Sequence, residues 1–181
     1  LAIDEETDLE NMTKIVLKKI NRESDFDIES IADSISKYFI LDDDFKVFLF
    51  LEDNSIEIKN ERKYENLDTE IVWDIPSDLG VTKHSMSGLK VTGKLFSTKK
   101  PISPSSNMRG ITLFSRKKLV NKPEYFASSE SNHFFSYLTG WLNVDFIEDL
   151  DSDVISTSRQ SLNWDFPDLV KFREVLNSMI K

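Results

Sequence analysis

The residues best suited to chemistry lie in the C-terminal third of the chain, around a single arginine. Arg159 stands in the run 157–164 (TSRQSLNW), shortly after a stretch rich in carboxylates. A guanidinium is always charged and offers a planar set of donors, which suits phosphate oxygens and the charge that develops in phosphoryl transfer. The alternative is a structural role, in which Arg159 pairs with Asp151 or Asp153 across the turn. Residue chemistry alone favours the structural role, since most arginines near acids are structural.

Other catalytic and metal-binding sets are missing from the sequence. The two histidines, His84 and His133, are far apart and cysteine is absent, so we expect no metal site. The acidic run from Asp149 resembles the start of a calcium loop, but Val154 stands where glycine is needed and Gln160 where glutamate is needed. The five glycines form no phosphate-binding loop. The chain therefore has no self-contained catalytic constellation.

A basic segment interrupts an otherwise acidic chain. The net charge is -9, yet residues 81–122 contain no Asp or Glu and hold ten of the 23 lysines and arginines. Such a segment suits phosphate, either in a nucleotide or in nucleic acid. The alternative is that these side chains keep strand edges and loops soluble. Lys99 and Lys100 are individual candidates, because they open a loop rich in serine and proline.

Length and hydropathy indicate one well-buried domain of a soluble protein. The chain has 181 residues, no apolar run long enough to span a membrane and no secretory signal. We therefore expect a cytoplasmic protein with no membrane partner. The chain opens with Leu1 and soon enters an acidic stretch, so we expect a fragment of a longer protein.

The elements that must position these residues alternate between strands and helices. A final helix is expected to begin near Pro167, with Leu169, Phe172, Leu176 and Met179 on one face. The strand at 45–51 is apolar throughout and is expected to be buried on both faces. The fold class is expected to be α/β, an α+β layered sandwich with one sheet. Further strands are expected at 13–20, 56–59, 89–96, 111–114 and 141–146, helices at 28–39 and 131–138, and a loop at 97–107.

Several segments resemble a known family when taken in order. They are residues 110–114 (GITLF), 118–120 (KLV), 137–140 (YLTG), 145–149 (DFIED) and 157–164 (TSRQSLNW). Together they resemble the transducer, or middle, domain of GHKL ATPases, the group of histidine kinases, gyrase B, MutL and heat-shock chaperones, and in particular a bacterial branch of it. The resemblance covers residues 85–181 well and the first half more loosely.

The resemblance implies a division of the chain. Residues 1–22 would hold the last strand and linker of a truncated nucleotide-binding domain, although Met12 stands where the family has glycine. Residues 23–181 would form a transducer domain, with the ribosomal-protein-like fold of the second domain of gyrase B and MutL. The family's E-x-x-x-N box and D-x-G-x-G motif are absent from this chain. The fragment is therefore expected to bind no ATP or Mg by itself.

The resemblance also implies site residues. Arg159 would reach the γ-phosphate of ATP held in the missing domain, with Asn163, one helical turn on, as a polar helper and Gln160 beside it. Lys99 or Lys100 would match the lysine with which the gyrase B and MutL branch reaches the γ-phosphate of ATP.

The implied partners are the chain's own ATPase domain and a second copy of the parent protein, in DNA repair, restriction or defence, or chaperone-like work. Two alternatives stay open. One is a nucleic-acid-binding module that uses the basic segment 83–122 to contact DNA. The other is a non-catalytic protein-interaction domain.

Overall fold

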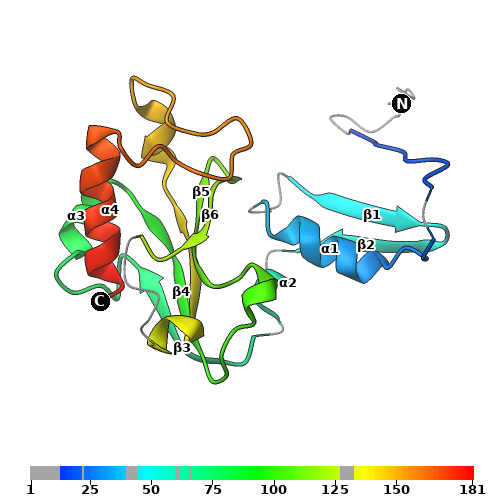
Figure 1. Ribbon diagram of the computed structural model, residues 1–181, viewed down its shortest axis with the longest axis horizontal. Helices are drawn as coiled ribbons and strands as arrows, with labels where there is room; N and C mark the ends of the chain where they lie inside the picture. The colour runs from blue at the N-terminus through cyan, green and yellow to red at the C-terminus, as the bar shows by residue number, and fades with distance from the viewer. Residues whose placement is uncertain (1–12, 22, 40–44, 60–61, 66, 127–132) are drawn as a thin grey trace.

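The computed structural model describes residues 13–21, 23–39, 45–59, 62–65, 67–126 and 133–181. These residues form a mixed α/β structure with two sheets (Figure 1), compatible with the expected α+β class but with two sheets in place of one. The elements are α1 (Ile28–Ser36), β1 (Val47–Leu51), β2 (Asn54–Ile58), α2 (Arg62–Glu65), β3 (Thr69–Ile75), α3 (Lys83–Gly88), β4 (Thr92–Thr98), β5 (Gly110–Ser115), β6 (Lys118–Glu124), β7 (Leu138–Asn143) and α4 (Pro167–Met179).

The larger sheet has the strand order β3-β4-β7-β5-β6. All neighbours are antiparallel except β5 and β7, which run parallel. Parallel neighbours end at the same edge of a sheet, so the residues that follow β5 and β7 meet there. Strand β4 runs the opposite way, and the loop that follows it leaves from the other end of the sheet.

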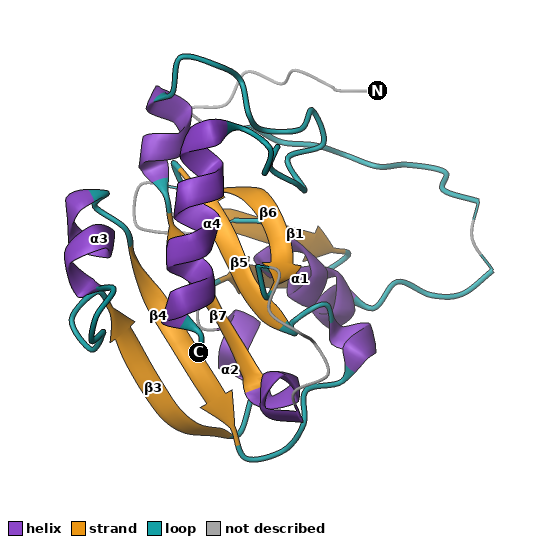
Figure 2. Cartoon of the chain, turned by 60° about the vertical axis from the view of Figure 1, so that its left-hand side comes forward, coloured by secondary structure: helices purple, strands orange, loops and turns teal. Residues whose placement is uncertain are grey.

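Helix α4 covers one face of the larger sheet (Figure 2). Its apolar side chains pack on the inward-facing leucines of the strands in one hydrophobic core. Pro167 occupies the first turn of the helix, where its missing N–H costs no intrahelical hydrogen bond. The sequence-based prediction of this helix and its buried face is confirmed. The buried residues of α4 are Leu169, Phe172 and Leu176.

The short helix α2 packs on the opposite face of the sheet. Tyr64 stacks on Phe96 with 4.6 Å between ring centroids, and the Nζ of Lys63 lies 4.5 Å from the centroid of the Phe114 ring. Among the described residues, neither Lys63 Nζ nor Tyr64 OH has a hydrogen-bond partner, and both atoms are out of contact with solvent. Burial, together with the nearby charge of Lys37, lowers the pKa of Lys63 to about 7. Burial also raises the pKa of Tyr64.

A smaller unit of α1, β1 and β2 lies beside the sheet, with α2 between them (Figure 1). The Asp27 side chain caps α1 by accepting a hydrogen bond from the N–H of Glu29. The helix covers one face of the hairpin in a separate small core. On the other face, the side chains of Phe48 and Phe50 are exposed by 49% and 76%. The expectation of burial on both faces of 45–51 is therefore wrong, because a single helix covers only one face of a two-stranded sheet.

The predicted strand at 13–20 is not formed. The described residues 13–21 are irregular, and Ile15 and Leu17 are exposed by 75% and 73%. A strand needs a neighbouring backbone to pair with, and alternating apolar residues do not supply one. Residues 1–12 and 22 lie outside the described part of the chain. The assignment of 1–22 to a nucleotide-binding domain, and of 23–181 to a transducer domain, stays a prediction.

Two further elements differ from expectation. The strand predicted at 141–146 is β7, which begins three residues earlier, at Leu138. The segment predicted as a helix at 131–138 is a 3₁₀ helix over His133–Tyr137, with 131 and 132 outside the described residues. Within the parts of the chain that the structure describes, no helix is both long enough and apolar enough to cross a bilayer.

Candidate functional site

Arg159 lies at the tip of a closed loop near one end of the larger sheet. Ile155 and Leu162 form an antiparallel bridge that closes the loop 156–161. The loop is tied to β6, because the N–H of Leu162 donates to the side-chain oxygen of Asn121 at 3.0 Å. Arg159 has a φ of 52°, a left-handed conformation that is costly for residues other than glycine, asparagine and aspartate. This placement presents its side chain, which is 37% exposed, at the surface.

The guanidinium of Arg159 is held by two acceptors. Its Nη2 lies 2.6 Å from Oε1 of Glu148, and its Nε donates to the carbonyl of Leu119 at 3.2 Å. Sequence reasoning placed the structural partner at Asp151 or Asp153, and this is wrong in detail. Glu148 takes that place because it belongs to η3 (Asp145–Asp149), the 3₁₀ helix that follows β7 at the same edge of the sheet.

A second arginine reaches the same carboxylate. Arg116 and Lys117 form the two-residue turn between β5 and β6, with φ of 47° and 65°. The Nη1 of Arg116 lies 3.4 Å from Oε2 of Glu148, and its Nη2 lies 2.9 Å from Oδ1 of Asp149. The backbone N–H of Arg116 donates to Oδ1 of Asp145 at 2.5 Å, which anchors the turn. Sequence reasoning missed Arg116 as a site residue.

Glu148 therefore joins two turns that are distant in sequence. One carboxylate oxygen contacts Arg159 and the other contacts Arg116. The Glu148 side chain is only 19% exposed, so solvent screens these contacts less than it screens an ordinary surface ion pair. The parallel pairing of β5 with β7 produces this arrangement, because the β5–β6 turn and the 3₁₀ helix emerge side by side.

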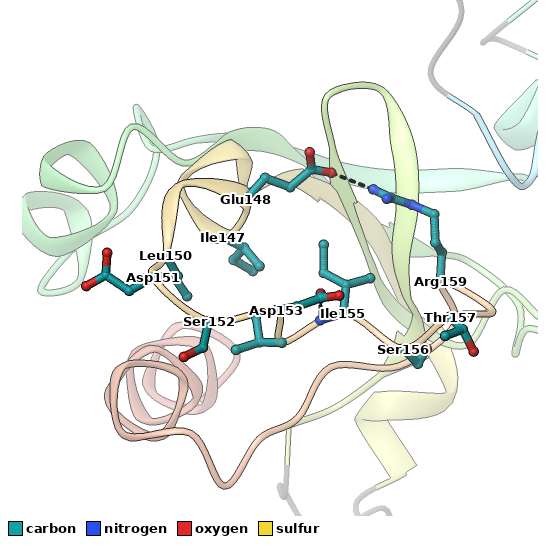
Figure 3. Close-up of a pocket in the computed structure, with 11 residues that line it drawn as sticks. Ile147, Glu148, Leu150, Asp151, Ser152, Asp153, Ile155, Ser156, Thr157 and Arg159 are labelled. Atoms are coloured by element: carbon teal, nitrogen blue, oxygen red, sulfur yellow. Dashed lines mark hydrogen bonds and ion pairs between the residues drawn. The ribbon is translucent and has the colours of Figure 1, made fainter.

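A cavity of about 460 Å³ opens beside the Arg159–Glu148 pair. Figure 3 shows the two side chains facing each other across its edge. The lining mixes carboxylates, hydroxyls and the single guanidinium of Arg159, and the carboxylates oppose the entry of a free anion. An anion would therefore bind at the guanidinium edge of the cavity. The lining residues are Ile147, Glu148, Leu150, Asp151, Ser152, Asp153, Val154, Ile155, Ser156, Thr157 and Arg159.

Gln160 and Asn163 lie outside this lining. The backbone N–H of Gln160 donates to Oγ of Ser156 at 3.2 Å, and its carbonyl accepts from Lys122 at 3.0 Å. Asn163 Oδ1 accepts from the N–H of Asp165 at 3.2 Å, in the turn that leads into α4. The segment between Arg159 and Asn163 is not helical, so the expected spacing of one helical turn is wrong. The contacts of both residues order the local backbone.

Lys99 and Lys100 lie at the other end of the sheet. Strand β4 pairs Thr92 with Asn143 and Ser97 with Leu138, so its last residues are roughly 17 Å from the edge where β7 ends. Lys99 Nζ pairs with Oδ1 of Asp68 at 2.9 Å, and this hydrogen bond, together with the carboxylate's charge, raises the pKa of Lys99. The structure therefore does not bring either lysine together with Arg159.

The basic segment 83–122 is divided in the same way. Arg116 and Lys117 lie at the edge where β5 ends, whereas Lys99, Lys100 and Arg109 lie at the opposite edge, where β4 ends and β5 begins. Two of its lysines are paired with acids of β3 or the segment before it, Lys94 with Asp74 and Lys99 with Asp68. These residues do not gather on one surface.

The chain matches no protein-family model and no curated protein. Within the described residues, no three of the histidines and acids gather in a way that could hold a metal ion. The candidate site is therefore defined by its geometry: two arginines from separate turns, joined by one partly buried carboxylate.

The strained turn between β5 and β6 gives a testable prediction. Replacing Arg116–Lys117 by Asn–Gly is expected to raise the free energy of unfolding by about 1 kcal/mol, because Asn–Gly suits two consecutive positive φ values. The lost ion pairs of Arg116, which is 60% exposed, offset only a small part of this gain. Urea unfolding measures the effect, and Arg116→Ala serves as the control for the ion pairs. An unchanged or lower free energy of unfolding in the Asn–Gly variant would contradict the prediction.

Proposed function

We propose that this chain is the transducer domain of a GHKL-type ATPase. In this proposal Arg159 contacts the γ-phosphate of ATP, which is held with Mg by a separate nucleotide-binding domain. The observation that supports it best is the placement of Arg159 at a loop tip, partly exposed, on a backbone conformation unfavourable for arginine. Strain of this kind is often kept where the side chain is needed at one position for function.

Electrostatics gives the role of such an arginine. Phosphoryl transfer spreads negative charge over the oxygens of the transferred group, and a guanidinium placed beside them stabilises that charge. The sequence has no glycine-rich loop to hold a nucleotide. The phosphate would therefore come from another domain, and closure of that domain on this one would be needed for hydrolysis.

The ion pair with Glu148 determines the resting state in this proposal. With no phosphate present, the carboxylate neutralises Arg159 and holds its side chain against β6. Closure would then exchange a carboxylate partner for a phosphate partner. A guanidinium binds both in the same two-pronged geometry, so the exchange needs little movement of the loop.

The resemblance, and not the geometry, suggests the wider setting. It suggests a dimeric cytoplasmic ATPase in DNA repair, restriction or defence, or chaperone-like work. The basic segment 83–122 has residues at both ends of the larger sheet, so we do not propose DNA binding as a second function.

The experiment compares ATP hydrolysis by the protein that joins this chain to a nucleotide-binding domain, with residues 23–181 present or removed. We expect the shortened protein to bind ATP and to hydrolyse it far more slowly. Nucleotide affinity is measured by calorimetry and hydrolysis by phosphate release. Equal rates of hydrolysis in the two proteins would show that this chain supplies nothing to the reaction.

A further inference from the structure

We infer that Arg116 is a second phosphate-contacting residue of this site, and that Glu148 is the positioning residue that holds both arginines until a phosphate replaces it. The inference rests on the proposed function for the identity of the phosphate, the terminal phosphates of a nucleotide. It adds a residue and an exchange step to that function.

The carboxylate of Glu148 contacts both arginines. Its two oxygens contact two different guanidinium groups, at 2.6 Å for Arg159 and 3.4 Å for Arg116. Both guanidinium groups therefore border one small volume, which Glu148 now fills. A phosphate group also presents several oxygens from a single atom, and guanidinium groups bind it as they bind carboxylate. The place of the Glu148 carboxylate thus has the positive surroundings that a phosphate group needs.

The two arginines are positioned independently of each other. The turn of Arg116 is anchored by Asp145, whose Oδ1 accepts the backbone N–H at 2.5 Å. The loop of Arg159 is anchored by the bridge from Ile155 to Leu162. Removal of Glu148 would leave both arginines close together, a preorganised arrangement that suits an anion with more than one charge.

Charge explains why phosphate would displace Glu148. The carboxylate brings one negative charge and two oxygens to two guanidinium groups, whereas pyrophosphate brings more charge and more oxygens. Asp149 stays paired with Arg116 at 2.9 Å and continues to orient it. Because Glu148 is mostly buried, its ion pairs compete effectively, and the unassisted chain should bind phosphate weakly. Glu148 therefore keeps the site closed to free phosphate.

The test is titration of the 181-residue chain with pyrophosphate, followed by the NMR signals of the arginine Nε–H groups. Glu148→Gln keeps the shape and removes the charge, and we expect it to tighten pyrophosphate binding roughly tenfold or more. The signals of both Arg116 and Arg159 should shift in this variant. Adding Arg116→Ala to Glu148→Gln should return the affinity to the wild-type level or below.

Asp68→Asn is the matched control. It removes one carboxylate and releases Lys99, at the opposite end of the sheet, so it reproduces the change in net charge without touching the two arginines. We expect it to change pyrophosphate affinity less than twofold. Equal tightening by Asp68→Asn and Glu148→Gln would overturn the inference, as would a Glu148→Gln complex in which only the Arg159 signal shifts.

A second variant covers the case in which Glu148→Gln does not fold, as judged by its thermal unfolding. Glu148→Asp keeps the charge but is too short to contact both arginines. We expect it to tighten pyrophosphate binding, by less than Glu148→Gln does. Unchanged affinity in this folded variant would overturn the inference. The proposed function can fail while the anion site is correct. This would be the result if both arginines bound pyrophosphate tightly in Glu148→Gln but ATP hydrolysis stayed normal after removal of residues 23–181.

Discussion

Arg159→Ala is expected to lower the kcat of ATP hydrolysis about 10³-fold in the protein that carries this chain, with little change in the Kd for ATP. The effect falls on kcat because the guanidinium meets a charge that is largest in the transition state. The affinity for ATP is set by the domain that holds the nucleotide. Single-turnover hydrolysis and calorimetric titration of a non-hydrolysable analogue measure the two quantities separately.

Two further variants decide what the arginine supplies. Arg159→Lys keeps the charge but loses the planar fork, so we expect kcat to stay at least about tenfold below that of the wild type. Lys99→Ala tests the lysine that the resemblance to gyrase B and MutL suggested. Lys99 pairs with Asp68 at the other end of the sheet, so its removal should change kcat less than twofold. A large loss with Lys99→Ala and none with Arg159→Ala would reverse the assignment.

Lys63→Met is expected to raise the free energy of unfolding at pH 7 by roughly 3 kcal/mol. Lys63 Nζ lies on the sheet face under α2, and no hydrogen-bond partner for it occurs among the described residues. Burial is the main reason that the pKa of Lys63 is lowered to about 7, from 10.5 in an exposed lysine. Methionine keeps the length and the packing on Phe114 without a charge to bury.

The sign of the pH dependence follows from the lowered pKa. Between pH 7 and pH 10.5 the unfolded chain holds the proton of Lys63 and the folded chain does not, so the wild type gains stability as the pH rises. Below pH 7 both states are protonated and this contribution no longer changes. The raised pKa of Tyr64 acts in the opposite direction above pH 10, because the folded state then keeps the phenolic proton longer.

Urea unfolding from pH 7 to pH 9.5 therefore tests Lys63 with little contribution from Tyr64. The difference in stability between Lys63→Met and the wild type should be largest at pH 7 and shrink steadily toward pH 9.5. Lys46→Met, at an exposed lysine just before β1, is the matched control and should change stability by less than about 0.5 kcal/mol at every pH. A difference for Lys63→Met that does not depend on pH would contradict the lowered pKa.

Local sequence signals predicted the elements whose structure depends on nearby residues. Helix α4 follows from Pro167 at its start and from apolar residues at helical spacing, and β1 and β2 correspond to the strands predicted at 45–51 and 56–59. The segment 13–20 alternates in a strand-like way and was also predicted as a strand. It forms no strand, because pairing depends on a neighbouring backbone that the segment's own residues do not encode.

The candidate site was predicted only in part for a similar reason. Arg159 was selected by the family resemblance that the residues around it carry. Arg116 and Glu148 are 32 residues apart, and they meet because β5 and β7 run parallel, a pairing that no local pattern reveals. Lys99 was a phosphate candidate because it opens a loop rich in serine and proline and because the resemblance to gyrase B and MutL implies a lysine of this kind. The opposite direction of β4 places it at the far end of the sheet.

The central position of β7 has a consequence for how the protein is made. Strand β7 lies between β4 and β5, both of which precede it in sequence. During synthesis, β3–β4 and β5–β6 would form first as two separate pairs, each with an unpaired edge strand. The two pairs can join into one five-stranded sheet only when residue 143, the last residue of β7, has left the ribosome. Until then the nascent chain exposes two apolar edges, a state in which chaperone binding or aggregation competes with folding.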